Sequence, residues 1–361
     1  SMMESPLRHN PPFLICACKV LVALSRMPPA VGLWPHVDYA LYCKAVLAAV
    51  TEHRKNAAVQ VAACRAIKCL STSHAATDVI IEVGAAYTLA LLLLVHKDNP
   101  HVATNVLVTM SAWVQLRKEL CDTLLEANAP ASAAAVLVRF KKLPMPCEAA
   151  CMLLRRLCLR EGGPEAAVAA KAVPNLLQCL PFLLGHTKAL VEALLLLNLL
   201  FTGAGDGALE QAAAGGAVDL VAFALRRHPD HEKVQEYGCL ALAALARLAT
   251  VLYRTLQLSA VKLAVAAIRT HARKPGVVAR ACELLEVFAL YPRANVSRLK
   301  ECGVPFLLVN ALRAAKKKPR LLRSIASAIA ALSLRDAGFQ AGFHDLHADE
   351  TALECLKGAG G

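Results

Sequence analysis

The chain has 361 residues, 57% of them hydrophobic, and a formal net charge of +13. The hydrophobic share exceeds the roughly 45–50% of ordinary globular chains. However, no stretch reaches the roughly 18 uninterrupted apolar residues that a membrane-spanning helix needs, so we expect no membrane span. The length alone suggests two or three domains.

An apolar helix rich in small residues is predicted at residues 13–24, and its pattern recurs along the chain. A cysteine, Cys18, is followed by leucine, valine and alanine at helical spacing. The same pattern returns around Cys64, Cys151, Cys239 and Cys282. We prefer this interpretation to a signal-peptide core because Lys19 interrupts the apolar run. Residues 1–12 then form a polar tail, and residues 26–36, with three prolines, form a loop.

A turn residue that opens a helix sets the period of the repeat. It occurs at Gly84, Asn128, Ala172, Gly216, Ser259 and Gly303. Successive markers are therefore 44, 44, 44, 43 and 44 residues apart. Each unit is predicted to contain a short helix, a turn, a second helix, a loop and a longer third helix. Such self-similarity indicates one elongated solenoid in which each unit contacts only its neighbours, and this overrides the length-based domain estimate.

Three helices in about 44 residues follow the armadillo plan. Residues 301–308 and 234–246 resemble the armadillo consensus. Residues 235–242, Gln-Glu-Tyr-Gly-Cys-Leu-Ala-Leu, are similar to repeats in the armadillo regions of leucine-rich-repeat kinases and other multidomain proteins. The resemblance covers roughly residues 13–334. It implies an all-α, right-handed α-solenoid of about seven repeats plus a partial N-terminal one, and we expect residues 335–361 to form a C-terminal capping segment.

The fourteen cysteines and the histidines give no metal-site prediction. Cysteines at one repeat position are expected to be small buried residues. A reducing compartment suits them, so we expect a cytoplasmic location, with the nucleus as the alternative. The pair Cys16 and Cys18 lacks partners at zinc-finger spacing, and His344 with His347 is better explained as part of a terminal cap. No cofactor is predicted.

The third helices of an armadillo stack line its concave face, so the resemblance implies a partner-binding groove there. Positions one and four residues after the repeated cysteine should look into it. The predicted groove residues are Lys19, Arg65, Lys68, Arg155, Asn198, Leu240 and Ala243. Importin-α-like proteins hold basic peptides with a ladder of Trp and Asn, of which only Asn198 is matched here. Catenin-like grooves, which are basic and take acidic extended peptides, are the nearer analogy.

A second set of cations lies in the loops between second and third helices. We name it the basic ridge, and its predicted members are Lys141, Lys142, Arg226, Arg227, Arg273, Lys274, Lys316, Lys317, Lys318 and Arg320. Loops one repeat apart should stack along one edge. Two explanations stay open at this point: solubility for an apolar chain, or binding of an anionic partner.

The sequence contains no nucleophile elbow, zinc-protease motif or phosphate-binding loop signature. The glycine-rich residues 203–207 lack the strand and the Gly-Lys-Ser/Thr of a phosphate loop. We therefore predict no enzyme but a protein-protein interaction scaffold, or the regulatory region of a larger protein, whose partner is partly acidic. The alternative hypothesis is binding of nucleic acid or an anionic surface through the basic ridge.

Overall fold

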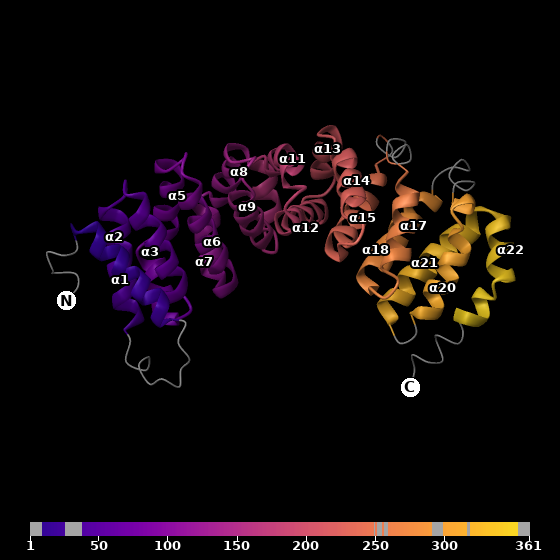
Figure 1. Ribbon diagram of the computed structural model, residues 1–361, viewed down its shortest axis with the longest axis horizontal. Helices are drawn as coiled ribbons and strands as arrows, with labels where there is room; N and C mark the ends of the chain where they lie inside the picture. Colours follow the sequence, from indigo (N-terminus) through magenta and orange to yellow (C-terminus); the bar gives the residue numbers. More distant parts are fainter. Residues whose placement is uncertain are drawn as a thin grey trace. The chain divides into compact units, whose positions relative to one another are not determined.

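The computed structural model describes residues 9–25, 38–248, 250, 255, 259–290, 299–315 and 318–352 (Figure 1). All regular secondary structure in these residues is helical, which confirms the predicted all-α class. The chain divides into two compact units, unit 1 at Ser1–Gly203 and unit 2 at Ala204–Gly361. The division falls at the start of the glycine-rich loop between two predicted repeats.

Unit 1 contains the predicted first, second and third helices in order. Its first helices are α4 (His74–Glu82), α7 (Lys118–Glu126) and α10 (Gly163–Ala169). Its second helices are α2 (Tyr39–Glu52), α5 (Ala85–Val95), α8 (Ala129–Arg139) and α11 (Ala172–Leu183). Its third helices are α1 (Pro11–Leu24), α3 (Ala57–Leu70), α6 (Pro100–Leu116), α9 (Pro144–Leu157) and α12 (Thr187–Gly203). The helix expected at residues 13–24 thus begins at Pro11.

Unit 2 repeats the same order. It opens with the first helix α13 (Asp206–Ala214). Its second helices are α14 (Ala217–Arg227), α17 (Ala260–Thr270) and α20 (Val304–Ala314). Its third helices are α15 (Glu232–Ala246), α18 (Pro275–Leu290) and α21 (Pro319–Arg335), and α22 (Ala337–Asp345) follows.

A single residue in the left-handed conformation joins each first helix to its second helix. The residue has φ of 61° at Gly84 and 55° at Asn128. In the next repeat it is Lys171, with φ of 60°, so the marker predicted at Ala172 is wrong by one residue. Ala172 instead starts α11, because the repeat before it is one residue shorter than assumed. The chain bends sharply at this turn, by 67° between α4 and α5 and by 76° between α10 and α11.

Asparagine side chains start three of the third helices in unit 1. At α1, Asn10 Oδ1 accepts from the backbone N–H group of Phe13 at 3.3 Å. Asn56 Oδ1 accepts hydrogen bonds from the backbone N–H groups of Ala58 and Val59, at 3.1 and 3.2 Å. Asn99 caps α6 in the same way. These bonds satisfy N–H groups that have no partner within the helix, which is why the loop ends there.

Buried side chains hold the carboxyl ends of the second helices. Gln60 Nε2 donates to the carbonyl oxygens of Val50 and His53, at 3.0 and 2.8 Å. Gln235 does the same in unit 2, and Cys147 Sγ donates to the carbonyl of Phe140 at the equivalent place. The loop backbone between second and third helices is therefore fixed from inside the core.

Neighbouring loops also touch within each unit. His96 Nε2 lies 2.7 Å from the carbonyl oxygen of Arg54, one repeat earlier in unit 1. In unit 2 His271 Nε2 lies 2.9 Å from the carbonyl oxygen of Pro229. The predicted stacking of equivalent loops is therefore present inside each unit.

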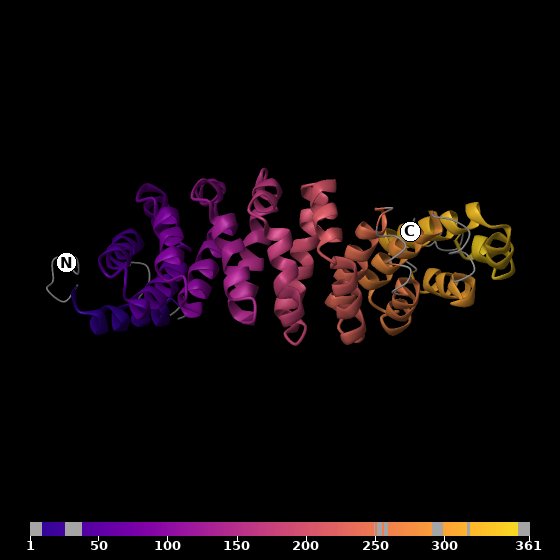
Figure 2. The ribbon, with the colours of Figure 1, turned by 90° about the horizontal axis from the view of Figure 1, so that it is seen from above.

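The core lies between successive repeats. In unit 1 the third helices α3, α6, α9 and α12 pack on one another in order, and in unit 2 α15, α18 and α21 do so; Figure 2 shows the successive repeats of unit 1 side by side. The repeat-position cysteines Cys64, Cys239 and Cys282 are fully buried and unpaired, as predicted. Burial raises the pKa of Cys64 and of Cys239 to about 12. Trp113 is also fully buried, as expected of a core aromatic.

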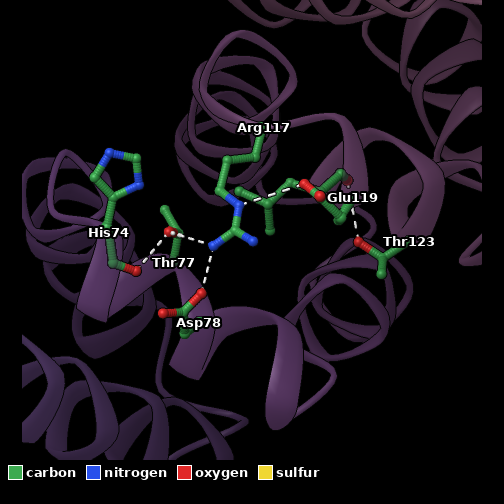
Figure 3. A network of polar contacts seen from close by, with 7 residues as sticks. His74, Thr77, Asp78, Arg117, Glu119 and Thr123 are labelled. Carbon is green, nitrogen blue, oxygen red and sulfur yellow. Dashed lines mark hydrogen bonds and ion pairs between the residues drawn. The ribbon is translucent and has the colours of Figure 1, made fainter.

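A polar network ties two first helices of unit 1 together (Figure 3). Arg117, in the link between α6 and α7, pairs with Asp78 on α4 and lies 3.3 Å from Glu119 Oε2 through its Nε atom. Thr77 Oγ1 lies 3.5 Å from Arg117 Nη1 and donates to the carbonyl of His74. The network links α4 to the first helix of the next repeat.

The structure places the predicted cap in part. Helix α22 packs on α20 and α21, and its own side chains Phe339 and Phe343 are buried. The loop predicted at 26–36, most of the tail 1–12 and the end of the capping segment lie outside the described residues. No single helix among the described residues is long and apolar enough to cross a membrane, although three bent helix pairs reach that length and composition together.

Candidate partner-binding groove

A groove of about 770 Å³ lies on unit 1 between its first three third helices. Helix α1 contributes Lys19, and α3 contributes Arg65 and Lys68, so three of the predicted groove residues meet there. The largest apolar side chains of the lining are Ile15, Val22, Val61 and Val108, with Ala57, Ala58 and Ala62 beside them. The groove therefore combines cations with a short apolar floor.

The repeat explains why these cations share one surface. Lys19 and Arg65 each follow the cysteine of their helix by one residue, and Lys68 lies one turn beyond Arg65. All three side chains are exposed. Arg65 Nε donates to Asn105 Oδ1 on α6 at 3.0 Å, and Asn105 Nδ2 donates to the carbonyl of His101 at 2.8 Å. The guanidinium is thus fixed through Nε, and its terminal nitrogens have no hydrogen-bond partner within the described residues.

The electrostatics of the groove are one-sided. No carboxylate lines it, and within the described part of the chain no acidic side chain forms an ion pair with Lys19, Arg65 or Lys68. His101 on α6 and Asn99, which caps this helix, add further polar groups to the lining. The surface therefore favours an anionic ligand.

Arg155 lies on α9, outside this lining, and already has an acidic partner. Its Nε lies 2.6 Å from Glu192 Oε2 on α12, and its Nη2 donates to Glu192 Oε1 at 3.4 Å. Both side chains are about one-fifth exposed, at 20% and 21%. Arg155 therefore joins two third helices and is less available to a partner than the three groove cations.

Two other predicted residues are buried. Asn198 on α12 is 7% exposed, and its Nδ2 donates to the carbonyl of Leu194 in its own helix. In unit 2 Ala243 is 2% exposed, whereas Leu240 is half-buried. Both side chains belong to the core, so the expected placement of Ala243 and Asn198 on an open groove surface is wrong, and their contact with a partner stays a prediction.

Of the predicted basic ridge, Lys141, Lys142, Arg273, Lys274 and Lys318 lie between a second and a third helix, whereas Arg226 and Arg227 end α14 and Arg320 lies in the first turn of α21. Two of the loop residues have partners. Lys274 Nζ lies 2.7 Å from Glu232 Oε2, and Lys142 Nζ lies 5.9 Å from the ring centre of Phe182. The other ridge residues within the structure are Lys141, Arg226, Arg227, Arg273, Lys318 and Arg320. Lys316 and Lys317 lie outside the described residues.

Sequence reasoning missed the contribution of α6. His101, Asn105 and Val108 follow one another at helical spacing, one face of α6, and all three line the groove. The third helix of this repeat has Leu107 where its neighbours have a cysteine, so the pattern indicated Val108 but not the two polar residues before it. Extending the same helical face toward the N-terminus of α6 would have found both. Among the described residues, no cluster of His, Cys, Asp and Glu could hold a metal ion.

Comparison with known proteins gives a fold. No protein-family model matches the chain, and no curated protein matches it in sequence. An engineered protein from a structural genomics consortium is similar over 99% of this chain and 97% of its own, with 16% identity and a TM-score of 0.65. A computationally designed armadillo repeat protein for modular peptide recognition covers 69% of this chain and 98% of its own, with 14% identity and a TM-score of 0.55.

A structure from work on a phosphorylation switch in the interaction between cadherin and β-catenin is also similar. It covers 90% of this chain and 67% of its own, at 15% identity and a TM-score of 0.56. These identities are low, so the likeness concerns architecture. Together with the three-helix repeat, the bend at each left-handed residue and the stacked third helices, it shows that the chain has the armadillo-repeat fold.

Proposed function

We propose that the protein is an interaction scaffold whose unit 1 binds an acidic, extended segment of a protein partner in the groove between α1, α3 and α6. The observation that carries this proposal is the set of three exposed cations, Lys19, Arg65 and Lys68, around a groove without a carboxylate. Solvated cations scattered over a surface would not share one groove with an apolar floor.

The groove suits a peptide in which acidic side chains alternate with apolar side chains. Arg65 can grip a carboxylate with its terminal nitrogens, and Lys68 offers a second charge one turn away. Valines on α1, α3 and α6 can take apolar side chains of the same segment. Because packed helices lie about 10 Å apart and an extended chain rises roughly 3.3 Å per residue, we expect carboxylates about three residues apart.

The neighbours in fold support a peptide as the ligand. One of them is a designed armadillo repeat protein in complex with the basic peptide (KR)4, at 15% identity and a TM-score of 0.55. The cations of unit 1 favour a ligand of the opposite charge. An armadillo-repeat groove would thus bind an acidic peptide here, where the designed protein binds a basic one.

A fluorescence anisotropy titration tests the proposal. The probes are a labelled peptide of alternating glutamate and valine and a single-stranded RNA of matched length, each titrated at several salt concentrations. We expect saturable peptide binding that Arg65→Glu with Lys68→Glu weakens at least about tenfold. Both side chains are exposed, so the melting temperature of this variant should stay nearly unchanged.

The matched control is Lys141→Glu with Lys142→Glu on the basic ridge, which should leave peptide affinity within about twofold. Tight RNA binding that falls steeply with salt and is lost in the ridge variant would make nucleic acid the ligand instead. Equal loss of peptide affinity in both variants would mean that net charge, and not the groove, governs binding.

A further inference from the structure

Helix α5 is apolar around its whole circumference, yet one side of it is exposed. Apart from Tyr87 and Thr88, its residues are alanine, leucine and valine. The side chains of Tyr87, Leu91 and Leu94 are 53%, 38% and 69% exposed, and Val95 beside them is 39% exposed. These residues recur at helical spacing, so they form one stripe along the helix. A helix that is apolar on every side is normally buried on every side, so the stripe is suited to a contact that covers it.

The same positions are polar in the other repeats. They are the third, seventh, tenth and eleventh residues after the left-handed residue between first and second helices. Among the described second helices that follow such a residue, each one except α5 has a charged or amide side chain at one or more of these positions. These side chains are Arg139, Gln178, Asp219, Arg226, Arg227, Lys262, Arg269, Asn310 and Arg313. The apolar stripe is therefore a property of α5 and not of the repeat.

A groove of about 370 Å³ between α5 and α8 borders the stripe. Its lining includes the buried Leu93 and Val136 and the exposed Leu94 and Val138. The small side chain of Ala135 on α8 leaves room between them. Pockets that hold small molecules measure about 300–1,000 Å³, so this groove is large enough for an aromatic side chain. Figure 1 shows α5 and α8 along the upper edge of unit 1.

The two ends of α5 carry opposite charges. Glu82 lies just before its N-terminal end, and Lys97 lies just after its C-terminal end. Both residues are exposed, and neither side chain forms an ion pair or a hydrogen bond within the described residues. The acid next to Lys97 in the sequence, Asp98, is already paired with Arg139. Helix α5 therefore presents an acid, an apolar stripe and a base in that order.

An antiparallel copy of α5 has these three features in the reverse order. A two-fold axis creates an interface in which residue i contacts residue j and residue j contacts residue i. With the axis near Leu91, Glu82 of each copy lies opposite Lys97 of the other, and Tyr87 lies opposite Leu94. Both pairs are centred within one helical turn of Leu91. The exposed side of α5 is thus complementary to itself.

We propose that the chain forms a homodimer in which α5 of unit 1 pairs antiparallel with α5 of a second copy. Tyr87 of each copy enters the groove between α5 and α8 of the other, where Ser132 and Lys97 offer polar partners for its hydroxyl group. The 11 residues of α5 span only about 16 Å. The interface is therefore small, and the dimer is in equilibrium with the monomer.

The charges favour a second copy over other occupants. An anionic membrane would attract Lys97 but repel Glu82, and Asp78 lies one turn before Glu82 on α4. A helix of another protein would need the same order of acid, apolar stripe and base by coincidence. A second copy has that order by symmetry.

Sedimentation equilibrium of the full chain over a wide range of concentrations tests for the dimer. We expect Leu94→Glu to weaken dimerisation at least about tenfold. Leu94 is 69% exposed, so this variant should keep its fold, which circular dichroism checks. The matched control is Phe223→Glu in unit 2. Phe223 occupies the position of Leu91 in its own repeat and is 48% exposed, and this variant should dimerise like the unchanged protein.

A charge exchange tests the antiparallel arrangement. Lys97→Glu and Glu82→Lys should each weaken the homodimer at least about threefold, because like charges then face each other at both ends of the α5 pair. An equimolar mixture of the two variants restores opposite charges at both ends. We expect it to form a mixed dimer with the affinity of the unchanged chain, measured by fluorescence-detected sedimentation with one variant labelled. The double variant should dimerise as well as the unchanged chain.

A chain that stays monomeric at every concentration overturns the proposal. A dimer that Leu94→Glu leaves unchanged, or that Phe223→Glu weakens equally, overturns it too, as does a mixture of charge variants without recovery. If the monomeric chain sediments with phosphatidylserine vesicles and Leu94→Glu abolishes this, the stripe binds a lipid surface and the proposal is wrong. All these variants keep Lys19, Arg65 and Lys68, so the acidic-peptide groove stands or falls separately.

Discussion

The third helices of the two units carry charge at the same repeat positions but use it differently. In unit 1 Lys19, Arg65 and Lys68 face an open groove. In unit 2 the equivalent Glu283 accepts from Arg280 Nη1 at 2.7 and 2.9 Å, and Glu286 accepts from Ser327 at 2.7 Å. A charged side chain at this repeat position is available to a partner only when neither its own helix nor the next third helix pairs with it.

The first prediction tests a feature that both units share, the buried cysteine of the third helix. Cys64 in unit 1 and Cys239 in unit 2 are fully buried, and burial raises the pKa of each thiol to about 12. The reactive thiolate is therefore scarce at pH 8, and we expect maleimide to label both roughly a thousandfold more slowly than the exposed Cys16. Peptide mapping by mass spectrometry gives the rates. Fast labelling of either cysteine would contradict a common core.

The second prediction tests the difference in charge. Reversal of Arg65 and Lys68 to glutamate should lower the affinity for an acidic peptide at least about tenfold, because two charge-assisted contacts are lost. Reversal of Lys233 and Arg280 in unit 2 should change it less than about twofold, because both cations are occupied by Glu236 and Glu283. Calorimetric titration measures both. Similar losses in the two variants would remove the distinction between the units.

The third prediction concerns Arg155. Among the predicted groove cations of unit 1, it is the one that forms an ion pair with a carboxylate in the described residues. Arg155→Ala leaves the partly buried Glu192 without its partner, and we expect a loss of about 1–2 kcal/mol in the free energy of unfolding. Lys233→Ala in unit 2, where Lys233 is 48% exposed, should cost no more than about 0.5 kcal/mol. Urea denaturation gives both values. If Arg155→Ala leaves the free energy of unfolding unchanged, the ion pair does not stabilise the fold, and Arg155 is again a candidate for partner binding.

The smallest expected effect lies at the turns between first and second helices. Unit 1 has Lys171 in the left-handed conformation, at φ of 60°, where unit 2 has Gly216 at φ of 76°. Lys171→Gly should stabilise the protein by about 0.5–1 kcal/mol, because a side chain disfavours this conformation. Gly216→Ala should destabilise it by about 1 kcal/mol, and an added Cβ there meets nothing within 4 Å, so the effect comes from the backbone alone. Thermal melts that show the same sign for both changes would contradict this.

The periodicity of the sequence predicted the fold well because packing repeats with it. A left-handed turn residue and a buried cysteine return at almost constant spacing, and within the described residues each lies in its expected place apart from the turn predicted at Ala172. The candidate site was predicted in part for the same reason: the spacing of Lys19, Arg65 and Lys68 determines which side of their helices they occupy.

The errors in the predicted site come from contacts that a one-dimensional pattern does not contain. Glu192, which pairs with Arg155, lies one repeat away on another helix. The burial of Ala243 depends on neighbouring helices, and His101 and Asn105 lie in a repeat without the marker cysteine. The division of the chain at residues 203 and 204 likewise had no counterpart in the repeat period. The single continuous solenoid stays a prediction.

The loops between second and third helices have a further consequence for how the sequence can change over time. Their backbone is held by the core residues Gln60, Cys147 and Gln235 and by His96 and His271, while loop cations such as Arg54, Lys97 and Arg273 are exposed. We expect mutations at such exposed positions to change stability little, so they can accumulate by drift or be selected for a new surface charge. The surface potential of these loops can therefore evolve with little effect on folding stability.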